Sequence, residues 1–108
     1  RVEARVGGAD MNPYLSIAAS LAAGLKGIEE KLTLDLAAIQ GNGYESQEGE
    51  QLANNLLTAA EKFKTSKVAQ EILGTEFVEH FANTRIWEWR QSQQAVTDWE
   101  LKRYFEII

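Results

Sequence analysis

The chain has 108 residues, 44% of them hydrophobic and 25% charged, and a formal net charge of −5. The acidic balance argues against binding to nucleic acid or to an anionic membrane surface. No apolar run reaches the roughly 18 residues that would predict a transmembrane helix. Cysteine is absent and His80 is the single histidine, which excludes a disulfide framework and a multi-histidine metal site and favours a cytoplasmic location.

Charged and apolar side chains alternate over residues 1–6, which predicts a short strand because side chains two apart point the same way. Arg1, Glu3 and Arg5 would share one face of that strand. One interpretation is a solvated face with weak ion pairs. The other is a site for a divalent cation beside a phosphate or carboxylate, since hard cations prefer carboxylate oxygen and arginine offers planar, paired donors. The spacing alone leaves both interpretations open.

A helix is predicted over residues 12–32. Asn12 can cap the first backbone N–H groups, and Pro13 at the first helical position needs no hydrogen-bond partner. Glycine inside a helix costs about 1 kcal/mol relative to alanine, so Gly24 and Gly27 indicate a close approach by another backbone. Apolar side chains recur along the helix at three- and four-residue steps, namely Tyr14, Ala18, Leu21, Leu25, Ile28 and Leu32.

The rest of the chain is predicted to form a surface loop over residues 33–51 and a helical tail over residues 52–108. In the tail, Ser66 is expected to cap one helix and Gly74 to end it. Thr75 is expected to cap the next helix, which runs to about Gln94. One apolar stripe of the tail comprises Leu52, Leu56, Ala59, Ala60 and Phe63.

A capping box, Thr97-Asp98-Trp99-Glu100, opens a last short helix. Its aromatic, apolar end suggests docking onto another surface. The predicted fold class is therefore mainly α, with one short strand and four or five helices in a single domain of residues 1–108. A lone strand does not make a stable sheet, and the sequence starts inside the strand pattern without an initiator methionine. We therefore expect residues 1–6 to pair with strands of a larger protein.

Two blocks of the sequence resemble the C-terminal part of the glutamine synthetase catalytic domain. The first is Arg1-Val2-Glu3-Ala4-Arg5 followed by Asn12-Pro13-Tyr14, which is similar to that family's charged strand, short corner and small-residue helix. The second runs from Val96 to Glu106 and resembles the branch that joins glutamate to amines such as putrescine or other polyamines. The resemblance implies that the chain is a C-terminal fragment of an α+β catalytic domain.

The resemblance also implies roles for three residues. Glu3 matches the glutamate that binds the divalent cation, Mg²⁺ or Mn²⁺, nearest the transferred phosphoryl group. Arg5 matches the arginine that holds glutamate and its phosphorylated intermediate, and Arg1 matches an arginine on the nucleotide-phosphate side. The implied reaction transfers the γ-phosphoryl group of ATP to glutamate, after which ammonia or a primary amine displaces the phosphate.

The segment Gly41-Asn42-Gly43-Tyr44-Glu45 in the predicted loop also resembles the family. On the resemblance of this loop and of the tail, an amine-accepting ligase is favoured over an ammonia-using glutamine synthetase. The family's other metal ligands precede the position of Arg1, so the 108 residues alone are expected to be inactive. Family active sites form between subunits of stacked rings, which implies a homo-oligomeric parent, and the apolar helix faces predict self-association of this chain. The alternative from another class is a stand-alone α-helical interaction module that binds through its aromatic C-terminal face.

Overall fold

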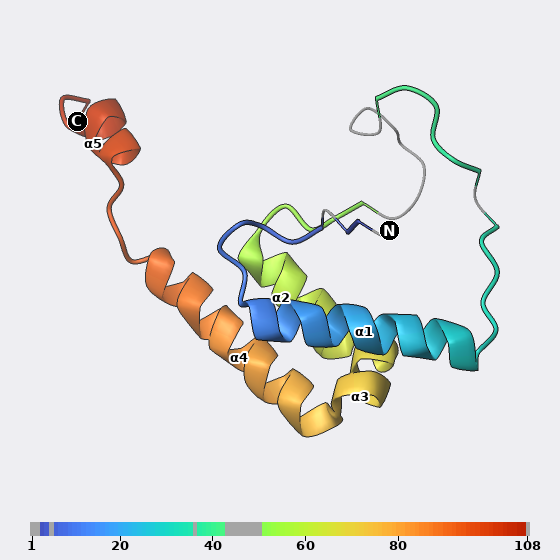
Figure 1. The fold of residues 1–108 in the computed structure, drawn as a ribbon. Helices are drawn as coiled ribbons and strands as arrows, with labels where there is room; N and C mark the ends of the chain where they lie inside the picture. The colour runs from blue at the N-terminus through green and yellow to red at the C-terminus, as the bar shows by residue number, and fades with distance from the viewer. Residues whose placement is uncertain (1–2, 5, 36, 43–50, 108) are drawn as a thin grey trace. The chain divides into compact units, whose positions relative to one another are not determined.

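The computed structural model describes residues 3–4, 6–35, 37–42 and 51–107. Over these residues the chain is mainly α, as predicted, and it divides into two compact units, Arg1–Gly49 and Glu50–Ile108. The first unit contains one helix and the second contains four (Figure 1). The helices are α1 (Pro13–Glu29), α2 (Leu56–Thr65), α3 (Lys67–Leu73), α4 (Thr75–Ser92) and α5 (Asp98–Tyr104).

The strand expected over residues 1–6 is not found where the structure describes the chain. Glu3, Ala4 and Val6 have irregular backbone, whereas Arg1, Val2 and Arg5 lie outside the described residues. The physical reason is that a strand is defined by its hydrogen bonds to a neighbouring strand, and none is present among the described residues. The expected loop over residues 33–51 has no helix or strand at its described positions, residues 33–35, 37–42 and 51.

Helix α1 starts one residue after Asn12 and ends at Glu29, three residues before the predicted end. Lys31 adopts a left-handed conformation with φ of 53°. The N–H of Leu32 donates to the carbonyl of Gly27 at 2.9 Å, and the N–H of Lys31 donates to that of Ile28 at 3.1 Å. These two bonds form a Schellman motif, which closes the helix at a residue that is not glycine.

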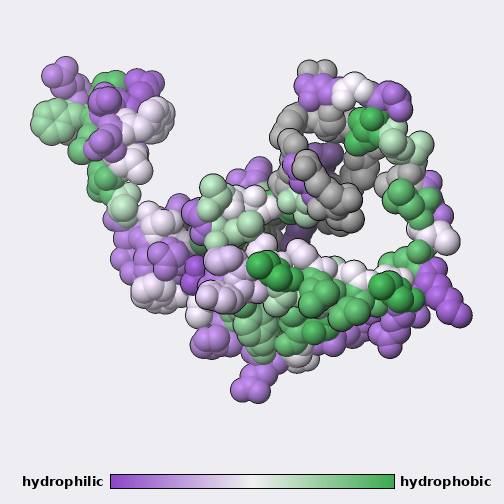
Figure 2. Space-filling view, viewed as in Figure 1, coloured by the Kyte–Doolittle hydropathy of each residue, from purple (hydrophilic) through white to green (hydrophobic). Residues whose placement is uncertain are grey.

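The predicted apolar stripe of α1 is exposed. Exposed fractions are 84% for Tyr14, 63% for Leu21 and 76% for Ile28, and Figure 2 shows apolar side chains gathered along this helix. A Cβ atom added at Gly24 or Gly27 would have no neighbour within 4 Å. The close approach expected at these two glycines is therefore not seen among the described residues.

In the second unit, α2 and α3 pack against α4 and against each other (Figure 1). The buried core consists of small side chains, which lets the helices approach closely: Ala60, Ala69, Val78 and Ala82. Ala59, which the sequence placed on the same stripe as Ala60, is exposed. Beside this core, the Phe81 ring lies edge-on to Phe63 at 5.9 Å and stacks on Phe77 at 5.7 Å between centroids.

Polar contacts at the C-terminal end of α2 lead into α3 and connect α2 to the middle of α4. Ser66 caps α3 by accepting a hydrogen bond from the N–H of Ala69 at 3.2 Å. Lys64 Nζ donates to Asn83 Oδ1 at 2.9 Å, which links α2 to α4. The predicted cap at Thr75 is wrong, because Gly74 holds the N-cap position of α4 and Thr75 is the first helical residue. Gly74 has φ of 84°, a conformation that a residue with a Cβ rarely adopts.

Helix α5 is opened by the predicted capping box. The hydroxyl of Thr97 accepts from the N–H of Glu100 at 3.2 Å, and the Glu100 carboxylate accepts from the N–H of Thr97 at 2.8 Å.

Among the described residues, no helix has the length and apolar character needed to cross a membrane.

Candidate functional site

The predicted site residues fall at the start of the chain, and the structure describes one of the three. Glu3 is exposed and has irregular backbone. Arg1 and Arg5 lie outside the described residues. Of the three predicted site residues, the structure therefore places Glu3.

A tight corner separates Glu3 from helix α1. The N–H of Met11 donates to the carbonyl of Gly8 at 3.3 Å, with Ala9 and Asp10 in the turn between them. This is the hydrogen bond that closes a β-turn. The corner before α1 is thus closed by its own backbone hydrogen bond.

The start of α1 is fixed immediately after this corner. Asn12 Oδ1 accepts hydrogen bonds from the N–H groups of Tyr14 at 3.0 Å and Leu15 at 3.2 Å. Pro13 occupies the first helical position, where its fixed φ suits the helix. The side chain of Asn12 is exposed, so its observed contacts are those of a helix cap, and they anchor the corner to α1.

The described residues do not make a metal site by themselves. No group of three or more His, Cys, Asp or Glu side chains that could hold a metal ion occurs in the part of the chain that the structure describes. Glu3 has the oxygen donor that Mg²⁺ and Mn²⁺ prefer, but one carboxylate does not complete a coordination sphere. His80 is exposed on α4 and belongs to no such group.

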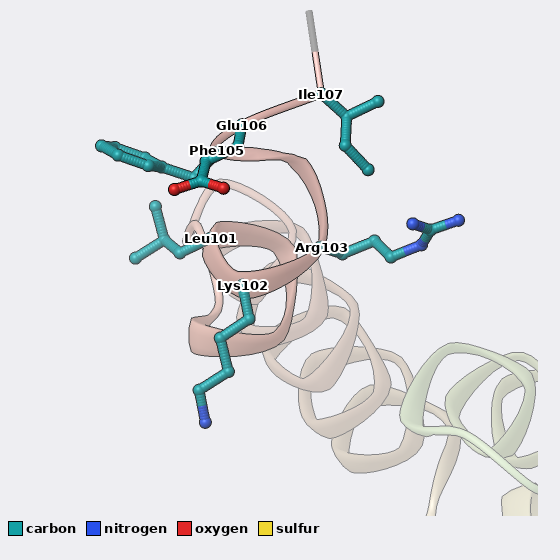
Figure 3. A pocket seen from close by; sticks show the side chains of 6 residues that line it. All are labelled: Leu101, Lys102, Arg103, Phe105, Glu106 and Ile107. Carbon is teal, nitrogen blue, oxygen red and sulfur yellow. The ribbon is translucent and has the colours of Figure 1, made fainter.

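An open depression at the C-terminal end is the other candidate. It is lined by Leu101, Lys102, Arg103, Phe105, Glu106 and Ile107. Figure 3 shows that Lys102, Arg103 and Ile107 point in different directions, so the depression has no convergent set of polar groups of the kind that binds a ligand. Tyr104 instead contacts Trp99, edge-on at 5.9 Å, and its ring lies 5.8 Å from the Arg103 guanidinium.

The sequence is similar to known proteins along its whole length. A family profile described as "Glutamine synthetase, catalytic domain" matches residues 1–104. The chain is 50% identical over 111 residues to type-1 glutamine synthetase 2 of Dictyostelium discoideum. It is 49% identical over 110 residues to glutamate–isopropylamine ligase of a Pseudomonas species, and 42% identical over 106 residues to gamma-glutamylethanolamide synthetase GlnA4 of Streptomyces coelicolor.

These alignments cover 100%, 100% and 98% of this chain but 21%, 24% and 22% of the three relatives. The chain therefore spans about a fifth to a quarter of the length of the curated relatives it matches.

Proposed function

This chain belongs to the glutamine synthetase family, and we propose that it forms the C-terminal part of the catalytic domain of an ATP-dependent ligase that joins glutamate to an amine. The observation that carries the proposal is the family match over residues 1–104, which includes the Arg1, Glu3 and Arg5 positions. The acidic, cysteine-free composition is consistent with a cytoplasmic enzyme.

In the proposed reaction the γ-phosphoryl group of ATP moves to the side-chain carboxylate of glutamate and ADP leaves. The amine nitrogen then attacks the resulting acyl phosphate, phosphate leaves, and an amide remains. Glu3 is proposed to contribute one ligand to the divalent cation that neutralises phosphate charge. Arg5 is proposed to hold glutamate and its phosphorylated form, and Arg1 to lie on the nucleotide-phosphate side.

Two of the three named relatives support an organic amine as the acceptor, because isopropylamine and an ethanolamide appear in their names. The segment from Val96 to Glu106 resembles the branch that joins glutamate to putrescine or other polyamines, which supports such an amine as the acceptor. The second candidate is an ammonia-using glutamine synthetase, which the 50% identity to the Dictyostelium protein supports.

The test assays the longer protein that contains this chain with glutamate, ATP, Mg²⁺ and one nitrogen donor at a time. The panel is ammonia, isopropylamine, ethanolamine and putrescine, and both ADP and the amide product are measured. We expect amide formation to be faster with at least one organic amine than with ammonia. Exclusive use of ammonia would favour the second candidate, and the absence of turnover with every donor would contradict the ligase proposal.

The exposed apolar side chains of α1 and α5 support a further part of the proposal, namely burial of these faces in a larger assembly. Side chains such as Tyr14, Ile28 and Trp99 are 64–84% exposed, and patches of this kind mark interaction surfaces. We propose that the parent is a homo-oligomer and that the 108-residue chain self-associates. Sedimentation equilibrium of the chain tests this, and a strict monomer would contradict it. The alternative of a stand-alone interaction module predicts instead that Arg1, Glu3 and Arg5 can be replaced without loss of binding to a partner.

A further inference from the structure

The stripe of α4 that packs into the core of the second unit contains one arginine. Val78 and Ala82 are fully buried, and the same face of the helix continues through Arg85 and Trp89 at three- and four-residue steps. Arg85 and Trp89 are only partly exposed, so Arg85 lies on the packed side of α4. Arginine is uncommon at such a position unless its charge has a partner.

Neighbouring groups on α4 orient the Arg85 guanidinium. It lies over the ring of Phe81, with 5.4 Å between its Cζ atom and the ring centroid. Its Nε atom donates a hydrogen bond to Thr84 Oγ1 at 3.3 Å, and the Thr84 hydroxyl donates to the carbonyl of Phe81 at 2.7 Å. A guanidinium held in this way presents its two Nη groups in a defined direction.

The two Nη groups of Arg85 have no acceptor in the part of the chain that the structure describes, where the contacts of this guanidinium are with Phe81 and Thr84. Both groups reach the surface, because no buried side-chain nitrogen or oxygen among the described residues lacks a hydrogen-bond partner. Lys64, also partly buried, instead donates to Asn83 at 2.9 Å. Arg85 is thus a partly buried cation whose paired donors are open to an acceptor.

We infer that Arg85 anchors a carboxylate, which the longer protein supplies from outside these 108 residues and which accepts hydrogen bonds from both Nη groups. A carboxylate is the protein group whose two oxygens match the planar fork of a guanidinium. The chain spans 21–24% of its three named relatives, so most of the polypeptide that could cover this face of α4 lies outside the chain. The inference rests on the proposed function, since it takes the chain as part of a longer catalytic domain.

The first test compares conservative variants of the longer protein by thermal unfolding. Arg85→Lys keeps the charge and the apolar stem but loses the planar pair of donors, and we expect the unfolding midpoint to fall by about 2–4 °C. Arg90→Lys is the matched control, because Arg90 is exposed on the same helix, and it should leave the midpoint unchanged. Equal midpoints for Arg85→Lys and the unmodified protein would overturn the inference.

A second comparison separates the carboxylate from the ring beneath the guanidinium. If a carboxylate is the partner, Arg85→Lys should lower the midpoint by a similar amount in a Phe81→Leu background, where the ring is gone. Loss of the effect in that background would assign it to the Phe81 contact and would contradict the carboxylate.

A structure of the longer protein identifies the partner directly, including the case in which Phe81→Leu does not fold. We expect a carboxylate oxygen of the same subunit, from outside residues 1–108, within about 3.2 Å of an Arg85 Nη atom. A carboxylate of a second copy, a phosphate of bound ATP or solvent alone at this place would each show the inference to be wrong.

Ligase turnover, measured on the same preparations, separates this inference from the proposed function. An unmodified protein without turnover contradicts the proposed function. An active protein in which no carboxylate meets Arg85 contradicts only the anchor.

Discussion

The Glu100 carboxylate accepts two hydrogen bonds from Thr97, one from its backbone N–H and one from its hydroxyl, each at 2.8 Å. Both bonds favour the ionised form, the backbone bond more strongly, and together they hold the pKa of Glu100 below its ordinary value. A carboxylate with a lowered pKa in the folded state stabilises that state above the unfolded pKa of about 4.3. The stabilisation is lost as the pH falls through the lowered pKa.

We therefore expect α5 to lose helicity on acidification below about pH 4.3. NMR titration of the Glu100 side chain should give a pKa below that of an unstructured glutamate. In Thr97→Ala the backbone N–H remains but the hydroxyl is gone, so the pKa should rise part of the way back. A Glu100 pKa that is ordinary or raised would contradict the capping geometry.

The left-handed residue that ends α1 gives a second prediction. Lys31 has φ of 53°, and such a conformation costs a residue with a Cβ about 1–2 kcal/mol. Lys31→Gly removes this cost but adds about 0.5–1 kcal/mol of unfolded-state entropy. The last turn of α1 is therefore expected to be more stable by roughly 0.5–1 kcal/mol. Amide hydrogen exchange measures this stability, and exchange over the last turn should be slower in the variant.

Glu30→Gly is the matched control for that prediction. Glu30 keeps an ordinary right-handed backbone with φ of −82°, and its carboxylate lies 2.7 Å from Lys26 Nζ. Glycine at this position brings flexibility without relieving strain, so exchange over the last turn should become faster. Equal effects of the two substitutions would mean that the Schellman geometry contributes nothing to the stability of α1.

The parts of the structure that could be predicted from the sequence are those set by neighbouring residues. The caps at Asn12, Ser66 and Thr97 each depend on a hydrogen bond across two or three residues, and a local pattern is enough to find them. The left-handed Lys31 that follows α1 could not be predicted, because the usual residue at that position is a glycine.

Features that depend on packing between helices could not be predicted from the pattern of apolar residues in the sequence. Ala59 and Ala60 are equivalent on an apolar stripe, and only contact with α4 decides which is buried. The turn closed by the Gly8–Met11 hydrogen bond lies in an irregular corner, where no periodic pattern marks it. In the candidate site, the proposed roles of Arg1 and Arg5 depend on the family resemblance, because both residues lie outside the described part of the chain.

Adjacent alanines on α2 provide a third prediction. Ala60 is 4% exposed in the core between α2 and α4, whereas Ala59 is exposed. Ala60→Leu adds three carbon atoms to a close-packed contact, which should lower the free energy of unfolding by about 1–3 kcal/mol. Ala59→Leu adds the same atoms on the solvent side and should change it by less than about 0.5 kcal/mol. Urea unfolding followed by circular dichroism compares the two, and equal losses would contradict the α2–α4 packing.

The last prediction concerns the chemistry that the 108 residues can support alone. Phosphoryl transfer needs cations and donors arranged around the phosphates, and the described residues hold no group of three metal-ligating side chains. Glu3 can contribute one carboxylate to such an arrangement but cannot complete it. We therefore expect the isolated chain to show no ATP-dependent formation of γ-glutamyl phosphate, which hydroxylamine would trap as a coloured hydroxamate.

The longer protein, assayed in parallel at equal concentration, is the positive control. Hydroxamate formation by the isolated chain at a comparable rate would mean that a complete site lies within these residues, and the proposal that they supply one edge of a larger site would be wrong.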